Sequence, residues 1–165
     1  MQQPTAQAAP PTLRNARMDD LPGILALYRE LRPGDPVLAT SSAQAALARL
    51  LATPGMHLIV CEAGGVLAST CLLAIIPNLA SGARPFAVIE HVVTLQSHRR
   101  RGHGRRVLEH ALGVAWSLDC CKVMLLSGQQ RPEAHRLYES AGFMGDVERG
   151  FVAKPGGPHR SMRPS

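Results

Sequence analysis

The chain has 165 residues, the length of a single domain, and 45% of them are hydrophobic, which allows one core built mainly from aliphatic side chains. Its net charge is +6, and arginine supplies nearly all of the positive charge, because Lys122 and Lys154 are the only lysines. The positive residues do not follow one long face and only 4% of residues are aromatic, so the composition argues against nucleic-acid binding.

The first half of the chain predicts a strand, two helices and a hairpin. Residues 1–11 are rich in Gln, Pro and Ala and predict a disordered lead rather than a signal peptide, since no basic segment precedes an apolar one. Each predicted helix begins near an Asp or Ser that can cap it, and a pair of glycines joins the last two strands. In chain order the elements are a strand at 13–18, helices at about 20–31 and 41–52, and strands at 56–63 and 66–76.

The second half alternates strands with helices, which is typical of parallel βαβ units. After a loop at 77–85, strands are expected at 86–94, 122–127 and 145–153, and helices at 104–118 and 132–141. The order β-α-α-β-β-β-α-β-α-β predicts an α/β fold with a mixed, mainly antiparallel central sheet, parallel fourth and fifth strands, and flanking helices. Residues 12–153 then form one domain, followed by a flexible tail at 154–165.

Cysteine usage, metal ligands and apolar length set the expected environment. The four cysteines show no C-x-x-C spacing and predict small buried side chains, and the seven histidines are scattered, so no metal site is expected. No apolar stretch reaches the ~20 residues that span a bilayer, so no membrane contact is expected. With no signal peptide, these features predict a reducing, cytoplasmic location.

The most informative local pattern is Arg99-x-x-Gly102-x-Gly104, which stands between a strand-like run and an amphipathic helix. Glycines allow a tight turn and a close backbone approach, and a helix start adds unpaired N–H donors and the positive end of a dipole. The pattern predicts a pyrophosphate cradle, and a basic helix start that happens to carry glycines is the alternative. The chain lacks G-x-x-x-x-G-K-[ST], and Val107 stands where a dinucleotide fingerprint needs its third glycine.

The element order and local motifs resemble the GNAT superfamily of acetyl-CoA-dependent N-acyltransferases over roughly residues 13–153. Residues 99–104 match its pyrophosphate loop, Q/R-x-x-G-x-G/A, and residues 137–143 (LYESAGF) match its late tyrosine motif. Residues 89–93 (IEHVV) and 120–125 (CCKVML) are similar to the branch that contains glucosamine-6-phosphate N-acetyltransferase. His91 stands where that branch has Asp or Asn, a departure that concerns the substrate rather than acetyl-CoA.

The resemblance implies that the fourth and fifth strands splay apart and that acetyl-CoA lies between them and against the loop. One amide, at Val92 or Val93, is implied to face the acetyl oxygen. For the arginines, a solvated basic turn is the alternative. The residues implied to hold acetyl-CoA are Val92, Val93, Thr94, Arg99, Arg100, Arg101, Gly102, His103, Gly104 and Arg105.

Two side chains are candidates for proton transfer. Tyr138 is the candidate general acid, because a phenol can protonate a leaving thiolate; the alternative is a packed helix tyrosine. Glu90 is the candidate base, directly or through a water, and the alternative is an anchor for the substrate ammonium or a cross-strand ion pair. His91 alternates with Glu90 and is expected on the opposite sheet face, unless a bulge near 92–93 re-aims it.

The predicted function is an acetyl-CoA-dependent N-acetyltransferase that acts on a primary amine of a small molecule, by direct attack through a tetrahedral intermediate. A protein or peptide N-acetyltransferase and a non-enzymatic acetyl-CoA-binding module are the alternatives. A basic chain suits lysine-rich peptides poorly, and the presence of both Tyr138 and Glu90 favours an enzyme. The resemblance further implies a homodimer, because that branch pairs through late strands and residues 145–153 are a candidate edge.

Overall fold

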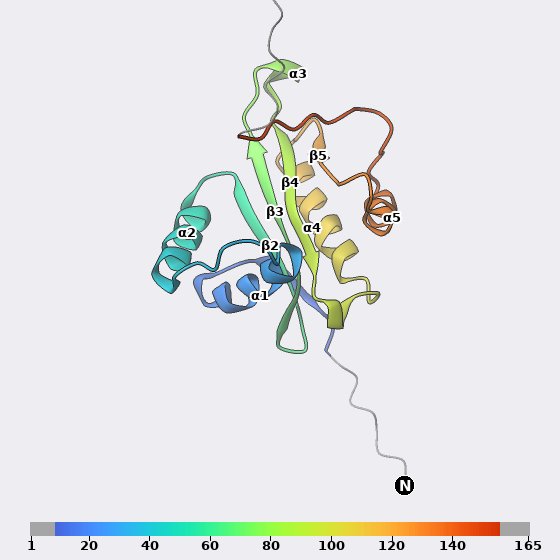
Figure 1. Ribbon diagram of the computed structural model, residues 1–165. Coiled ribbons are helices and arrows are strands. Elements are labelled where there is room, and N and C mark those ends of the chain that lie inside the picture. Colours follow the sequence, from blue (N-terminus) through green and yellow to red (C-terminus); the bar gives the residue numbers. More distant parts are fainter. Residues whose placement is uncertain (1–8, 156–165) are drawn as a thin grey trace, which may run out of the picture.

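The structure is a computed structural model that describes residues 9–155. Within them, five strands form one sheet in the order β1-β2-β3-β4-β5 (Figure 1). Neighbours pair antiparallel from β1 to β4, and β5 pairs parallel with β4, so the predicted sheet type is confirmed. The strands are β1 (Thr12–Asn15), β2 (Met56–Ala63), β3 (Val66–Ile76), β4 (Phe86–Thr94) and β5 (Val123–Leu125).

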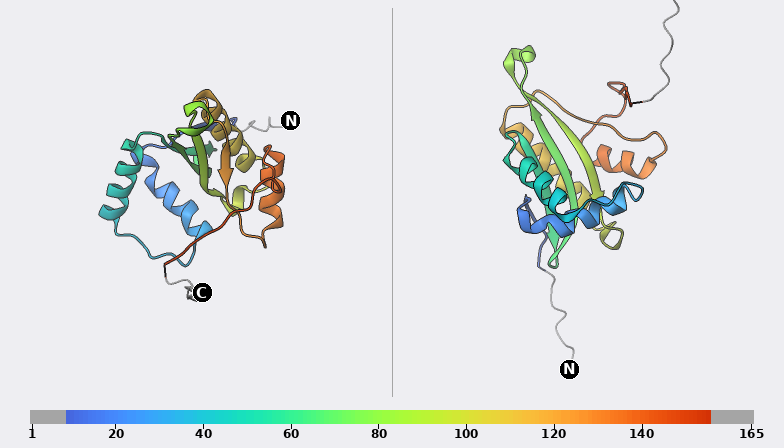
Figure 2. Two further views of the ribbon diagram at one scale, coloured as in Figure 1. Left: turned by 90° about the horizontal axis from the view of Figure 1, so that it is seen from above. Right: turned by 60° about the vertical axis from the view of Figure 1, so that its left-hand side comes forward.

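Helices cover both faces of this sheet, α1 and α2 on one side and α4 and α5 on the other (Figure 2). Short 3-10 turns, η1 (Met18–Asp20) and η2 (Gln96–His98), precede α1 and α4. The predicted helices are all present, with ends within two residues of those expected. They are α1 (Leu21–Leu31), α2 (Thr40–Ala52), α4 (His103–Ser117) and α5 (Pro132–Ser140).

The alternation of side chains along β2 separates the core into two layers. Leu58 and Val60 pack with α1 and α2, whereas Ile59 and Cys61 pack with α4. All four are at most 2% exposed, which explains why this strand reads as a continuous apolar run. The sheet therefore lies between two helical layers, each with its own apolar core.

The predicted last strand at 145–153 is wrong. These residues form no strand, and β5 has three residues where six were expected at 122–127. The segment still lies against β5, since Lys122 pairs with Glu148 at 3.1 Å and Gly150 packs on Leu126. The side chains of Val147, Phe151 and Val152 are 62%, 86% and 67% exposed, so no apolar face is buried to hold a strand in register.

Two smaller predictions also change. The first strand ends at Asn15, not at residue 18, because Asp20 accepts the Arg17 N–H at 2.8 Å and pairs with Arg14 at 2.6 Å, which turns the chain into η1. The loop at 77–85 contains α3 (Ala80–Ala83), whose Ser81 and Gly82 have φ of 54° and 71°, so it is a left-handed turn. Most of the predicted lead at 1–11 and tail at 154–165 lies outside the described residues.

Candidate active site

A cleft opens where the two parallel strands part. The pairing of β4 with β5 ends at Ile89 and Leu125, and β4 continues to Thr94 with no partner on that side among the described strands. The predicted splay is present at this point, and the cleft that it leaves has a volume of about 450 Å³. The cleft is lined by Leu31, Arg32, Asp35, Ile89, Glu90, His91, Val92, Leu125, Leu126, Arg131 and Tyr138.

A β-bulge in β4 brings His91 to the same cleft as Glu90. The β3–β4 register shifts here, so His91 and Val92 together oppose a single residue of β3. His91 has a φ of 54°, and its ring packs against Tyr28 with the ring centres 5.4 Å apart. Its Nδ1 atom is buried without a hydrogen-bond partner in the described structure. The alternation of side chains along a strand predicted that His91 lies on the sheet face opposite to Glu90, unless a bulge intervened. The bulge is present, and His91 lines the same cleft as Glu90.

Tyr138 is fixed by the way its own helix ends. Gly142 has a φ of 98° and turns the chain back, so that the Phe143 N–H donates to the Tyr138 carbonyl at 3.0 Å. The Phe143 ring then meets the Tyr138 ring edge-on, with centres 6.3 Å apart. The tyrosine motif seen in the sequence is thus a helix C-terminus that orients the phenol toward the cleft.

The surroundings of Tyr138 keep its phenol protonated. Burial raises the pKa of Tyr138; the positive charge of Arg131 lowers it in part, and the negative charge of Glu90 raises it further. A phenol whose pKa lies above its ordinary value is a proton donor at neutral pH. The structure therefore brings the two candidate catalytic side chains, Tyr138 and Glu90, to one cleft.

The bulge also decides which backbone amides of β4 face the cleft. Before it, the Ala87 N–H donates to the Lys122 carbonyl at 2.9 Å, on the β5 side. After it, the Leu95 N–H donates to Ala68 at 2.9 Å, on the β3 side, so the alternate residues Val92 and Thr94 face the open side. Val93, which lies between them in the sequence, faces β3 instead.

Val93 belongs to the other layer of the structure. Its side chain is 6% exposed in the core beneath α1 and α2, and its carbonyl accepts the Ser69 hydroxyl at 2.9 Å. Of the two amides considered for the acetyl oxygen, the Val92 amide lies on the cleft and the Val93 amide lies against β3. Thr94 lies one step further along the open side, where its carbonyl accepts the Arg99 Nε at 3.2 Å.

The loop from Arg99 to the start of α4 has the features of an anion cradle. Arg100 and Gly102 have φ of 61° and 78°, and Gly102 is the N-cap residue of α4. The first amide that bonds back to the cap is that of Arg106, which donates to the Gly102 carbonyl at 3.0 Å. The amides of residues 103–105 therefore have no acceptor within the helix, and they point out of its positive end.

Gly104 has a different part in this loop from the one its spacing suggests. A Cβ on Gly104 would lie 3.0 Å from Thr94 Oγ1 and 3.3 Å from Leu137 Cδ2, so this glycine allows α4 to pack closely on β4 and α5. A Cβ on Gly102 would meet nothing within 4 Å. Gly102 is thus required for its left-handed φ, and Gly104 for helix packing.

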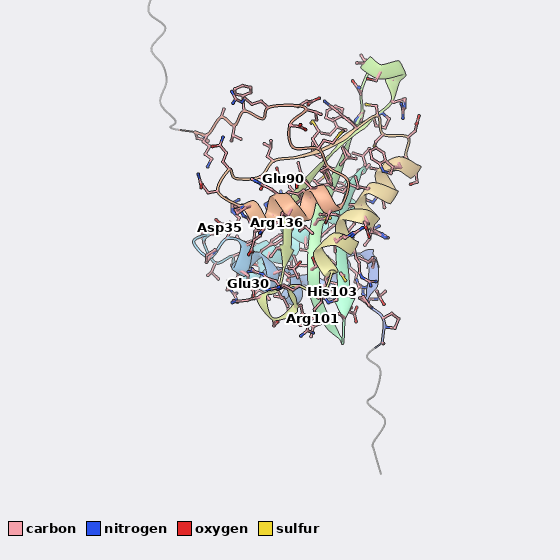
Figure 3. All side chains as sticks on the ribbon, turned by 90° about the vertical axis from the view of Figure 1, so that its right-hand side faces the viewer. Glu30, Asp35, Glu90, Arg101, His103 and Arg136 are labelled. Atoms are coloured by element: carbon pink, nitrogen blue, oxygen red, sulfur yellow. The ribbon has the colours of Figure 1, made fainter. Side chains whose placement is uncertain are left out.

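The side chains of the loop divide into exposed arginines and one buried histidine. Arg99, Arg100, Arg101 and Arg105 are exposed, and Arg105 pairs with Glu109 at 2.7 Å. His103 is 7% exposed, and burial followed by the charges of nearby basic residues lowers the pKa of its imidazole. Figure 3 shows Arg101 and His103 together where α4 begins, apart from Glu90, which lies beside α5.

Three charged residues of the cleft were not anticipated from the sequence. Arg32 and Asp35 follow the end of α1, and Arg131 is the N-cap of α5. The sequence predicts the helix ends at which these three residues lie. It does not predict that the end of α1 and the start of α5 line the same cleft. The break at Pro33-Gly34 is the one local signal, because it stops α1 where its end reaches the cleft.

Residues 9–155 contain neither a cluster of metal-binding side chains nor a membrane-spanning helix. No group of three or more His, Cys, Asp and Glu side chains lies close enough to hold a metal ion. No helix in this part of the chain is both long and apolar enough to cross a membrane. The cytoplasmic location stays a prediction.

One family and several solved structures of the same fold match the chain. The model of the acetyltransferase (GNAT) family matches residues 24–143, and no curated protein matches the chain. A solved protein of Agrobacterium tumefaciens str. C58, assigned as an acetyltransferase, is 46% identical, with 87% of this chain and 99% of that chain covered and a TM-score of 0.83.

More distant structures share the fold alone. Glucosamine-6-phosphate N-acetyltransferase from Arabidopsis thaliana is 18% identical, with 88% of this chain and 99% of that chain covered and a TM-score of 0.76. Aminoglycoside N-acetyltransferase AAC(6')-Iy in complex with CoA is 17% identical, with 92% of this chain and 99% of that chain covered and a TM-score of 0.76.

Proposed function

The chain belongs to the acetyltransferase (GNAT) family, and from this premise we propose that it transfers an acetyl group from acetyl-CoA to a primary amine of a small molecule, through a tetrahedral intermediate. The observation that carries the proposal is the cleft at the end of the β4–β5 pairing. It holds Glu90, Val92 and Tyr138 together, and the cradle at the start of α4 comes after β4 in the chain.

Acetyl-CoA fits the described residues at two points. The amides of residues 103–105 and the exposed arginines Arg99, Arg100, Arg101 and Arg105 would bind its pyrophosphate, because a helix N-terminus and guanidinium groups both favour phosphate oxygens. The open side of β4 at Val92 and Thr94 would hold the pantetheine arm by backbone hydrogen bonds. His103 would contribute its amide, since its ring is buried.

The proposed roles of the side chains balance the transfer. Glu90 takes a proton from the acceptor amine, directly or through a water, and the free nitrogen attacks the thioester carbon. The Val92 N–H donates to the carbonyl oxygen as negative charge develops there, a contribution that is typically ~3 kcal/mol. Tyr138 gives its proton to the sulfur as the carbon–sulfur bond breaks, and the nitrogen loses its remaining extra proton to solvent, from which the Tyr138 phenolate is reprotonated. These steps use no metal.

A small-molecule acceptor is favoured by the size of the cleft and by the net charge of the chain. About 450 Å³ accommodates a compact amine, and the net charge of +6 disfavours docking of lysine-rich peptides. Because residues 89–93 are similar to the glucosamine-6-phosphate branch, amino sugars remain candidate acceptors. His91 differs from the Asp or Asn that this branch has at the same position. Solved relatives at low identity include aminoglycoside acetyltransferases, one of them with sisomicin bound.

The experiment that tests the proposal is a thiol-release assay with acetyl-CoA against amines, amino sugars, polyamines and a lysine-rich peptide. Release of free thiol with at least one small amine, above the rate without acceptor, is the expected result. Release with the peptide alone would assign a protein substrate, and binding of acetyl-CoA without release for any acceptor would contradict the proposed transfer.

A further inference from the structure

The charged side chains of the cleft do not all remain available to a ligand. Arg32 and Asp35 pair with each other at 3.0 Å, and both lie at the rim. Glu90 and Arg131 line the same cleft, and neither has an ion-pair or side-chain hydrogen-bond partner within residues 9–155. The cleft therefore presents one unpaired carboxylate and one unpaired guanidinium to its contents.

These two groups line the cleft together with Tyr138 and come from different elements of the fold. Glu90 comes from β4, and Arg131 comes from the start of α5, about two helix turns before Tyr138. Both lie near enough to the phenol to act on its pKa, in opposite directions. A ligand that reaches the phenol therefore meets both a negative and a positive side chain.

We propose that the acceptor is a zwitterionic amine, with its amino group at Glu90 and a carboxylate or phosphate bound by Arg131. The proposal rests on the proposed acetyl transfer and adds the chemical class of the acceptor. Arginine suits this role because its planar fork donates two hydrogen bonds to one carboxylate or phosphate. Glu90 keeps the role already given to it at the amine.

The same charges disfavour acceptors with several positive groups. A polycationic amine needs several unpaired carboxylates around it, and in this cleft Asp35 is already neutralised by Arg32. A second ammonium group would also approach Arg131, and like charges at short range are unfavourable. The cleft thus selects against polyamines and aminoglycosides and for amines that carry an anion.

Matched pairs of acceptors test the class directly. In the thiol-release assay, L-amino acids are compared with their carboxamides, and amino-sugar phosphates with the same amino sugars without phosphate. The anionic member of at least one pair is expected to give a kcat/KM about tenfold higher or more, since a hydrogen bond between charged groups is lost in the other member. The two kinds of pair separate a carboxylate acceptor from a phosphate acceptor.

Variants of Arg131 test the residue. Arg131→Gln is expected to raise KM for the preferred anionic acceptor about tenfold or more, with kcat and the KM for acetyl-CoA close to wild type. Arg131→Glu is expected to invert the preference, so that a diamine becomes a better acceptor than the anionic amine. Arg136→Gln, on the exposed face of the same helix and outside the cleft lining, is the matched control and keeps the wild-type preference (Figure 3).

The outcomes separate this proposal from the proposed function. Equal kcat/KM for both members of every pair, with acetyl transfer intact, would overturn the zwitterionic acceptor and leave the acetyltransferase standing. A rise in the KM for acetyl-CoA in Arg131→Gln, with the acceptor preference kept, would assign Arg131 to the acetyl donor and also overturn it. Absence of transfer to every amine in the wild type would contradict the proposed function itself.

Discussion

At the scale of single residues, His91 holds a backbone conformation that favours glycine. Its φ of 54° lies in the left-handed region, which costs a residue with a Cβ about 1–2 kcal/mol. Such positions persist where the surrounding structure fixes them, and they concentrate at functional sites. Here the bulge places an imidazole with an unpartnered Nδ1 on the wall of the cleft, next to Glu90.

This strain can be measured with two truncations that remove the same ring. We expect His91→Gly to have a free energy of unfolding about 0.5–1 kcal/mol higher than His91→Ala, the reverse of the usual order in strands. Urea denaturation measures the difference. Val92, which does not have a positive φ, provides the control pair, and there the alanine variant is expected to be the more stable one. The same order at both positions would contradict a strained His91.

Tyr138 is the residue whose chemistry is most easily isolated. Tyr138→Phe keeps the ring packed against Phe143 and removes only the hydroxyl. If Tyr138 is the general acid, kcat falls about 10²–10⁴-fold and the affinity for acetyl-CoA changes little. Steady-state kinetics and direct titration with acetyl-CoA measure the two quantities. A loss of affinity at unchanged kcat would instead make Tyr138 a ligand-positioning residue, and no change in either would make it structural.

At the scale of elements, the approach of α4 to β4 and α5 depends on Gly104. A side chain there meets Thr94 and Leu137, so Gly104→Val must push the helix N-terminus away from the sheet. We expect a loss of about 1–3 kcal/mol in the free energy of unfolding, together with a fall in acetyl-CoA affinity because the amides of residues 103–105 move.

The matched control for this prediction lies on the same helix. Gly113 is exposed and a Cβ on it meets nothing within 4 Å, so Gly113→Val should leave stability and affinity near wild type. Urea denaturation and titration with acetyl-CoA compare the two variants. A Gly104→Val protein with wild-type affinity would show that the pyrophosphate binds elsewhere.

At the scale of the whole molecule, a ligand that binds across β4, α4 and α5 links elements that are far apart in the sequence. Acetyl-CoA at 100 times its Kd should stabilise the folded chain by about 2.7 kcal/mol, because it binds the folded state alone. For a domain of this size that corresponds to a rise in Tm of roughly 5–10 °C. A thermal shift assay with acetyl-CoA measures it, with free acetate as the control; an unchanged Tm at millimolar acetyl-CoA would exclude this mode of binding.

We expect a homodimer from exposed apolar side chains beside β5, although the predicted edge strand at 145–153 is absent. β5 is the last strand of the sheet, and the segment that follows α5 exposes four large apolar side chains: Met144, Val147, Phe151 and Val152. An exposed apolar segment of this kind favours association with a second copy.

Light scattering at micromolar concentration should therefore give twice the chain mass of 17.7 kDa. Replacing Phe151 and Val152 by Ser should return the mass to that of one chain. Leu79→Ser, at a 96% exposed position on the connection between β3 and β4, is the control and should remain dimeric. A monomer mass for the wild type would contradict the proposed dimer.

The sequence by itself determined the features that depend on neighbouring residues. Helical period placed α1, α2, α4 and α5, because this signal acts within a few turns of one chain segment. The predicted serine cap of the second helix is wrong, since Ala39 is the N-cap of α2 and both candidate serines lie inside the helix. The glycine-containing loop before α4 and the motif around Tyr138 were found for the same reason, since Gly102 and Gly142 adopt positive φ through local turns. These features identified the fold and one wall of the cleft.

Only the tertiary structure decided the features that depend on two segments meeting. The bulge that turns His91 to the cleft arises from pairing with β3, and Arg32, Asp35 and Arg131 line one cleft because the end of α1 and the start of α5 both reach it. The residues at 145–153 have the composition of a strand, yet no strand partner or buried face fixes them in the described chain. Strand register and loop proximity are set by long-range contacts, for which a local pattern carries no information.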